Sequence, residues 1–290
     1  MTILNILKPR KALNKAFLKV KAHRNEIELF KGNLINLLDR INESESEEFH
    51  KNLVADFLKN TYYGANHYIN TKGRNDLVIH NGSTASGTVG VIIEAKKPGN
   101  KAEMLRSDNI NVKAFQELVL YYLRERITHK NLEIKYLVVT NIYEWFIFDA
   151  NLFEKEFAEN KGLVKQFIDF EEGRLSGKTT DFFYKQIAEP AITAISHEVT
   201  FTWFDIRDYQ KPISTRFLDV QFCVVSCYPT YKLFIGRNNK SPKQFIFFNS
   251  VCKYLTYREP GVILYRTSNA IYQKTRVRSG FEFNLCPAEI

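Results

Sequence analysis

The sequence predicts an α/β fold in which a mixed central sheet is flanked by helices. Segments with one apolar face at helical spacing, such as residues 25–41 and 111–127, alternate with short, almost wholly apolar runs. The run over residues 89–95 is apolar at successive positions, which is typical of a strand buried on both faces at the centre of a sheet.

The elements are expected in a definite order along the chain. Asn25 can cap the first helix, and Ser44 or Ser46 can cap the second, which carries apolar residues from 49 to 58. Turn residues and a loop then bound two strands that read as a hairpin. The predicted strands are residues 76–80, 89–98, 134–140 and 145–149, and the later helices are residues 111–127 and 180–195.

The composition is that of an ordinary globular protein. Of 290 residues, 44% are hydrophobic and 25% are charged, which excludes collagen-like, disordered and disulfide-scaffold proteins. Every apolar run is shorter than the roughly 20 residues that a membrane-spanning helix needs. We therefore expect a cytoplasmic protein with no membrane partner.

Charge divides the chain into three expected parts. Residues 1–208 hold 29 basic and 28 acidic residues, whereas residues 209–290 hold 12 and 4 and contain all four cysteines. Residues before Asn25 include seven basic residues and no acid, and such an arm either neutralises phosphates or is a solvated terminus. We expect a basic arm over residues 1–24, a globular domain over residues 25–210 and a basic tail over residues 211–290.

The tail is aromatic and basic, and the sequence predicts no particular fold for it. Interleaved basic and aromatic residues are suited to nucleic-acid binding through phosphate contacts and base stacking. The alternative hypothesis is that residues 211–290 are a non-native product of a frameshift or a gene truncation, because charge and cysteine content change abruptly there.

Candidate catalytic groups lie where the two strands of the predicted hairpin end. Asp76 opens one strand, and Glu94 closes the other, with Lys96 two residues later on the same face. Hairpin pairing would place Asp76 beside Glu94, and two adjacent carboxylates need a counter-charge such as a divalent cation. Their oxygens and the backbone carbonyl of Ala95 suit Mg²⁺, with Mn²⁺ as an alternative. Lys96 would then steady or deprotonate a water for in-line attack at phosphorus.

The short Glu-x-Lys pattern alone indicates nothing, because it occurs three times. Only the first copy ends a buried strand, where a charge is costly unless it has a partner or a function. The alternative interpretation of that copy is an ordinary ion pair at the end of a strand. The three copies are Glu94/Lys96, Glu133/Lys135 and Glu159/Lys161.

The order of a helix with Glu, then Asp, then a strand with Glu-x-Lys, then a helix resembles the PD-(D/E)xK nuclease superfamily. Here the motif is Asn75-Asp76 and Glu94-Ala95-Lys96. Over about residues 8–212, the chain is similar to the N-terminal region of type IIG restriction–modification enzymes. The segments that carry this likeness are KPRKALNKAFLKVK, SEEFHKNLVADFL, TKGRNDLVIHNG, GVIIEAKKP, ELVLYYLRERITHKNLEIKYLVVTNIYEWFIFDA and TDFFYKQIAEP.

The resemblance implies a restriction-endonuclease-like core and a Mg²⁺-dependent endonuclease that hydrolyses phosphodiester bonds in double-stranded DNA. It implies that Asp76 and Glu94 hold the metal and that Lys96 serves the attacking water. It also implies further catalytic roles for Glu48 on the second helix and Gln116 on the helix after the Glu-x-Lys strand, although Glu48 is equally consistent with a solvated acid at a helix start.

The chain departs from those enzymes in having neither an Asn-Pro-Pro-Tyr/Phe motif nor a Phe-x-Gly-x-Gly loop. We therefore expect no methyltransferase activity and no S-adenosylmethionine site. The methyltransferase and target-recognition domains would lie on another chain. The alternative functions are a catalytically inactive remnant or DNA-binding module of a truncated restriction–methyltransferase gene and, less favoured, a stand-alone repair nuclease.

Overall fold

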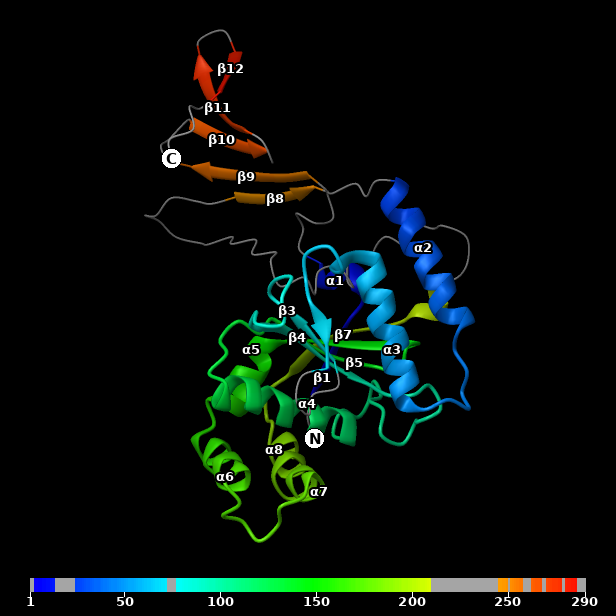
Figure 1. The fold of residues 1–290 in the computed structure, drawn as a ribbon. Helices are drawn as coiled ribbons and strands as arrows, with labels where there is room; N and C mark the ends of the chain where they lie inside the picture. Colours follow the sequence, from blue (N-terminus) through cyan, green and yellow to red (C-terminus); the bar gives the residue numbers. More distant parts are fainter. Residues whose placement is uncertain are drawn as a thin grey trace. The chain divides into compact units, whose positions relative to one another are not determined.

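The computed structural model describes residues 3–13, 24–71 and 77–209, and the backbone of five strands between residues 245 and 285 (Figure 1). The chain forms two compact units, Met1–Pro229 and Thr230–Ile290. The predicted α/β class is confirmed in the first unit, where helices flank a seven-stranded mixed sheet.

The sheet of the first unit has the strand order β1-β7-β6-β5-β4-β3-β2. Two strand pairs are parallel, β4 with β5 and β1 with β7, and the other pairs are antiparallel. The strands are β1 (Leu4–Leu7), β2 (Ile69–Asn70), β3 (Leu77–His80), β4 (Val89–Ala95), β5 (Tyr136–Thr140), β6 (Glu144–Asp149) and β7 (Val199–Asp205).

Helices lie on both faces of this sheet. The main helices are α1 (Pro9–Ala12), α2 (Arg24–Asp39), α3 (Glu47–Leu58), α4 (Lys113–Leu123), α5 (Ala150–Phe153), α6 (Lys161–Glu171), α7 (Thr180–Phe183) and α8 (Glu189–Thr193). Five-residue π-helical turns extend α3, α4, α5 and α7, and they are η2 (Lys59–Tyr63), η3 (Arg124–Thr128), η4 (Glu154–Ala158) and η5 (Tyr184–Ala188). Across the described residues, no helix combines the length and the apolar character needed to cross a membrane.

The strand β4 is buried on both faces, as its sequence predicts, and all seven of its residues are buried. Helices α2 and α3 cover one face of the sheet, and α4 to α8 cover the other (Figure 1). Alternate residues of β4 therefore enter two different cores: Val91 and Ile93 pack with the α2–α3 side, and Ile92 packs with the α4 side. Glu94 comes two residues after Ile92, so it lies on the same face of the strand, the face toward α4.

The first residues of the expected basic arm form a strand. Leu4–Leu7 pairs in parallel with β7, a contact between segments almost 200 residues apart that the local sequence does not indicate. Residues 14–23 of the expected arm lie outside the described residues.

The second unit contains a five-stranded antiparallel sheet in the order β12-β11-β10-β9-β8. Each strand pairs with the next one along the chain, which makes the sheet a simple meander. Its strands are β8 (Phe245–Asn249), β9 (Val251–Tyr257), β10 (Val262–Thr267), β11 (Ala270–Val277) and β12 (Gly280–Leu285).

Stability of the first unit should depend on pH through His67. Burial lowers the pKa of this side chain to about 4, and its ring packs edge-on against Tyr63 at a centroid distance of 5.7 Å. The unfolded chain, with an ordinary histidine pKa near 6.5, takes up the proton first as the pH falls. The contribution of His67 to the free energy of unfolding should therefore be constant above about pH 6.5 and fall by up to about 3 kcal/mol toward pH 4.

Urea unfolding between pH 7.5 and 4.5 measures this dependence. The matched variant is His67→Phe, which keeps a ring beside Tyr63 and cannot titrate. Its unfolding free energy should fall less steeply with pH than that of the wild type, and equal slopes would contradict the prediction.

Candidate active site

The end of β4 fixes Glu94 and Lys96 at the margin of the core. Glu94 lies opposite Val139 of β5 in the parallel register. One residue beyond the strand, the backbone N–H of Lys96 donates to the carbonyl of Thr140 at 2.8 Å, so the ladder with β5 continues past Ala95. The backbone of Lys96 is therefore anchored to the sheet directly after the end of β4.

The ammonium of Lys96 lies between two buried carboxylates. Its Nζ is 2.7 Å from Oε1 of Glu94 and 2.7 Å from Oε2 of Glu117, which belongs to α4. Burial acts to lower the pKa of Lys96, but the charges and hydrogen bonds of Glu94 and Glu117 outweigh it and raise that pKa well above its ordinary value. Lys96 is therefore a cation in this arrangement.

Two further carboxylates complete what we call the Lys96 cluster, which consists of Lys96, Glu94, Glu117, Glu47 and Glu103. Oε1 of Glu47 lies 3.4 Å from Nζ of Lys96, and Oε2 of Glu103 lies 3.7 Å from it. The side chains of Glu94, Lys96 and Glu117 are 1%, 3% and 9% exposed, whereas those of Glu103 and Glu47 are 30% and 39% exposed. The cluster is therefore closed on the Glu94 side and open to solvent on the side of Glu47 and Glu103.

Helix capping places Glu47. The helix α3 begins at this residue, and the Oγ of Ser46 accepts a hydrogen bond from the backbone N–H of Phe49 at 3.1 Å. A carboxylate in the first turn is favoured by the partial positive charge of the helix start. The same interaction that starts α3 thus brings an acidic side chain to the cluster.

Glu103 is held by partners of its own. Its carboxylate accepts hydrogen bonds from Lys113 at 2.8 Å and from Asn100 at 2.9 Å. Burial acts to raise the pKa of Glu103, but these two hydrogen bonds lower it overall. Glu103 therefore stays ionised, and it links the loop before α4 to Lys96.

A tyrosine from the helices beyond α4 borders the two inner carboxylates. Tyr184, in η5, is buried, and burial together with the negative charges of Glu117 and Glu94 raises its pKa to about 12. Its phenol is therefore neutral at ordinary pH and adds no charge to the cluster.

The residues expected to form the site come together only in part. Glu94 and Lys96 are in direct contact, as expected, and Asp76 lies outside the described residues. The described strand β3 begins at Leu77, which pairs with Ile93, the residue before Glu94. Ala95 lies in β4 opposite Thr140.

The two helical candidates are each one residue away from the carboxylate that reaches Lys96. Glu48 is 60% exposed and pairs with Lys51, while its neighbour Glu47 approaches Lys96. Gln116 donates a hydrogen bond to Oδ1 of Asn111 at 3.0 Å, while its neighbour Glu117 contacts Lys96. One residue corresponds to about 100° around a helix, so neighbouring residues face in different directions.

Glu117 is the main residue that the sequence analysis missed. It is the single carboxylate within the ten consecutive buried residues of α4, from Ala114 to Leu123. A charge inside such a run is costly without a partner, and that cost is the signal that could have identified it.

The other two Glu-x-Lys copies have different surroundings. Glu133 is exposed and accepts hydrogen bonds from Asn81 at 3.2 Å and from Thr88. Glu159 is exposed at the end of η4. The position at the end of a buried strand therefore does distinguish Glu94/Lys96 from the two copies that share its spacing.

The donor set of the cluster is made of carboxylate oxygens, which are the ligands that Mg²⁺ prefers. In the part of the chain that the structure describes, no three His, Cys, Asp or Glu side chains converge in a way that could hold a metal ion. Glu94 and Glu117 fit such an ion in their chemistry, and a third ligand would have to come from elsewhere, with Asp76 the candidate that the sequence supplies.

Comparison with known protein families gives a match over most of the chain. Residues 7–234 match a family model described as a domain of unknown function (DUF7149), and this stretch contains the whole Lys96 cluster. The matched stretch also runs past residue 210, where the globular domain was expected to end. No curated protein and no solved structure matches the chain.

Removal of the cation at the centre of the cluster should destabilise the protein strongly. Lys96→Met leaves Glu94 and Glu117 buried beside each other without their counter-charge, which should lower the free energy of unfolding by about 3–5 kcal/mol. Urea unfolding in EDTA measures this loss. Neutralising both acids as well, in Lys96→Met/Glu94→Gln/Glu117→Gln, should recover most of it.

The matched control is Lys31→Met, which breaks the more exposed pair with Glu28 on α2 and should cost about 1 kcal/mol or less. If Lys96→Met were as stable as the wild type, the buried ion pairs would not contribute as described.

Proposed function

Because the chain belongs to the DUF7149 family, whose function is unknown, we propose its activity from the site itself: a Mg²⁺-dependent endonuclease that hydrolyses phosphodiester bonds in DNA. The observation that carries the proposal is the buried Lys96 ammonium held by Glu94 and Glu117 at the end of the central strand. A buried charged group of this kind beside a solvent-facing opening is typical of a catalytic site.

The charge balance of the cluster favours a catalytic role over a structural ion pair. Four carboxylates surround Lys96, and the second nearby cation, Lys113, binds one of them, Glu103. Four negative charges against two positive ones leave an excess that a divalent cation would neutralise. A structural ion pair needs no such excess.

Glu94 and Glu117 are the residues that would hold the metal, and Asp76 is the expected third ligand. When bound, Mg²⁺ supplies positive charge that stabilises the phosphorane-like transition state and lowers the pKa of a water. The more exposed carboxylate of Glu47 lies on the open side, where it can accept a hydrogen bond from an entering water.

Lys96 would act on the attacking water through its ammonium. It is ion-paired with Glu94 and Glu117, and from the same position it can orient a water and stabilise the charge that develops on the phosphate. In the overall reaction, the water oxygen forms a bond to phosphorus and one P–O ester bond breaks. One proton of the water leaves to solvent, and the departing alkoxide oxygen takes one up.

The order of the elements supports the same proposal. The helix α3 carries Glu47, β3 follows Asp76, β4 ends in Glu94 and Lys96, and α4 carries Glu117. This is the order expected from the resemblance to PD-(D/E)xK nucleases. As the cleavage module of a type IIG system, the chain would depend on methyltransferase and target-recognition domains for sequence specificity, and alone it should bind DNA weakly and without sequence preference.

Cleavage of supercoiled plasmid by the purified full chain, with Mg²⁺ or Mn²⁺, tests the proposal. Glu94→Gln and Glu117→Gln should each lower the cleavage rate at least about a hundredfold, because each removes a metal ligand worth several kcal/mol. Circular dichroism should show that both variants remain folded.

The matched control is Glu133→Gln, which has the same Glu-x-Lys spacing but lies outside the cluster, and it should cleave at the wild-type rate. Cleavage that survives in both Glu94→Gln and Glu117→Gln would place the activity elsewhere. If the wild-type chain failed to cleave in the presence of Mg²⁺ and also in the presence of Mn²⁺, the proposal would be contradicted and an inactive remnant would be favoured.

A further inference from the structure

We propose that the loop of residues 97–112, between β4 and α4, is the surface that holds duplex DNA over the Lys96 cluster. The inference rests on the proposed function, because it identifies the surface through which the substrate of that site binds. It is carried by three features of the loop: its anchoring, its exposed cations and its position at the open side of the cluster.

The loop is anchored at both ends and in its middle. Met104, Leu105 and Ile110 are buried, which ties the loop to the core. Glu103 is bound by Lys113 at the start of α4 and lies near Lys96 at the end of β4. A long connection that is fixed in this way is typical of a functional loop, and little conformational entropy would be lost when it binds a ligand.

The tip of the loop is a tight turn that presents an arginine. The backbone N–H of Arg106 donates to the carbonyl of Asn109 at 3.0 Å, and the N–H of Asn109 donates back to Arg106 at 3.2 Å. The Arg106 side chain is 65% exposed and pairs with the still more exposed Asp108 at 3.2 Å. Such a pair is worth little in water, so the guanidinium can exchange Asp108 for a phosphate at low cost.

The loop adds two further cations beside this turn. Lys101 is exposed and Lys97 is partly exposed. The acid between them and the tip, Glu103, is bound by Lys113 and lies 3.7 Å from Lys96. The three cations of the loop therefore outnumber its other acid, Asp108. Exposed Lys and Arg side chains of this kind bind DNA through its phosphates, without reading its sequence.

The loop borders the side of the Lys96 cluster that is open to solvent. Solvent reaches the cluster on the side of Glu47 and Glu103, and Glu103 is itself part of the loop. A phosphate that approaches the buried Glu94 must therefore pass beside the loop. Since the cluster itself is negative, a polyanion would be repelled there without nearby cations.

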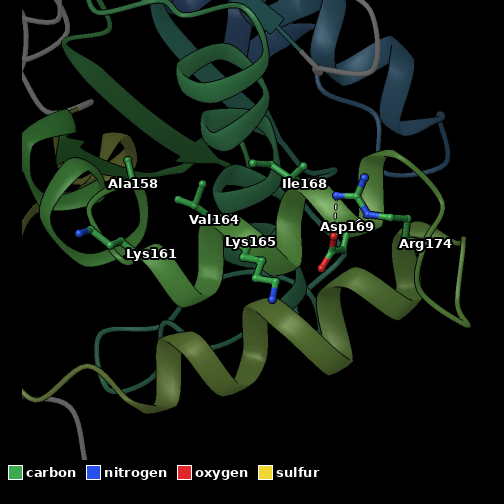
Figure 2. Close-up of a pocket in the computed structure, with 7 residues that line it drawn as sticks. All are labelled: Ala158, Lys161, Val164, Lys165, Ile168, Asp169 and Arg174. Carbon is green, nitrogen blue, oxygen red and sulfur yellow. Dashed lines mark hydrogen bonds and ion pairs between the residues drawn. The ribbon is translucent and has the colours of Figure 1, made fainter.

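A second basic surface on the first unit offers a comparison. A hollow of about 430 Å³ lies along α6. Figure 2 shows residues that line it, among them Lys161, Val164, Lys165 and Ile168. Its arginine, Arg174, is hydrogen-bonded to Asp169 at 2.7 Å. No residue of the Lys96 cluster lines this hollow, so its two lysines provide a control with the same number of charges.

The experiment compares two double variants of the full chain in a Glu94→Gln background, which prevents cleavage during the measurement. Fluorescence anisotropy with a labelled duplex of mixed sequence, at several salt concentrations, gives the dissociation constant and its salt dependence. Lys101→Gln/Arg106→Gln should weaken binding at least about tenfold near 0.1 M salt and lower the salt slope by about two. Lys161→Gln/Lys165→Gln should change the affinity less than about twofold.

Equal affinities of the loop variant and its parent would overturn the inference, as would an equal loss in the α6 variant. Absence of duplex binding by the parent would overturn it as well. These outcomes are separate from the plasmid assay. A chain that binds duplex through the loop but never cleaves would overturn the nuclease alone, and a chain that cleaves with affinity independent of Lys101 and Arg106 would overturn the loop alone.

Discussion

A buried ammonium is the constraint on which the arrangement of the first unit depends. Lys96 loses its hydration when it is buried, and only nearby carboxylates can compensate that loss. Those carboxylates come from four segments: β4 supplies Glu94, α4 supplies Glu117, α3 supplies Glu47 and the loop before α4 supplies Glu103. A single atom, Nζ of Lys96, therefore joins the two sides of the sheet at the end of its central strand.

A second polar network in the same unit shows what a purely structural arrangement looks like. Glu154 accepts hydrogen bonds from Tyr122 at 2.7 Å and from Arg126 at 2.7 and 2.6 Å. One carboxylate is matched by one guanidinium, and the network fastens the end of α4 to η4. The Lys96 cluster differs because its carboxylates outnumber its cations. Under the proposed function, a divalent cation would offset this imbalance.

The sequence predicted the strand of the site better than its helices. A strand side chain can point to one of two faces, so the apolar run before Glu94 and the two-residue step to Lys96 were enough to place both. A helix offers directions about 100° apart, and apolar spacing near Glu48 and Gln116 left the facing residue undetermined, so Glu47 and Glu117 were missed. The strand Leu4–Leu7 was also missed, because it depends on pairing with a segment almost 200 residues away.

Under the proposed function, a domain with almost no net charge has to bind a polyanionic substrate. Residues 1–208 hold 29 basic and 28 acidic side chains, so no overall field would draw DNA to this part of the chain. Any attraction of DNA to this domain must therefore come from the local arrangement of its charges. Around the site, the buried acids Glu94 and Glu117 contact Lys96 and Glu103 is bound by Lys113, while Lys101 and Arg106 are exposed. Because Coulomb interactions between exposed charges fade beyond about 10 Å in salt, a phosphate at the loop would meet the local cations first. Under the proposal, one loop thus supplies Glu103 to the cluster and the exposed cations Lys101 and Arg106 to the phosphates of DNA.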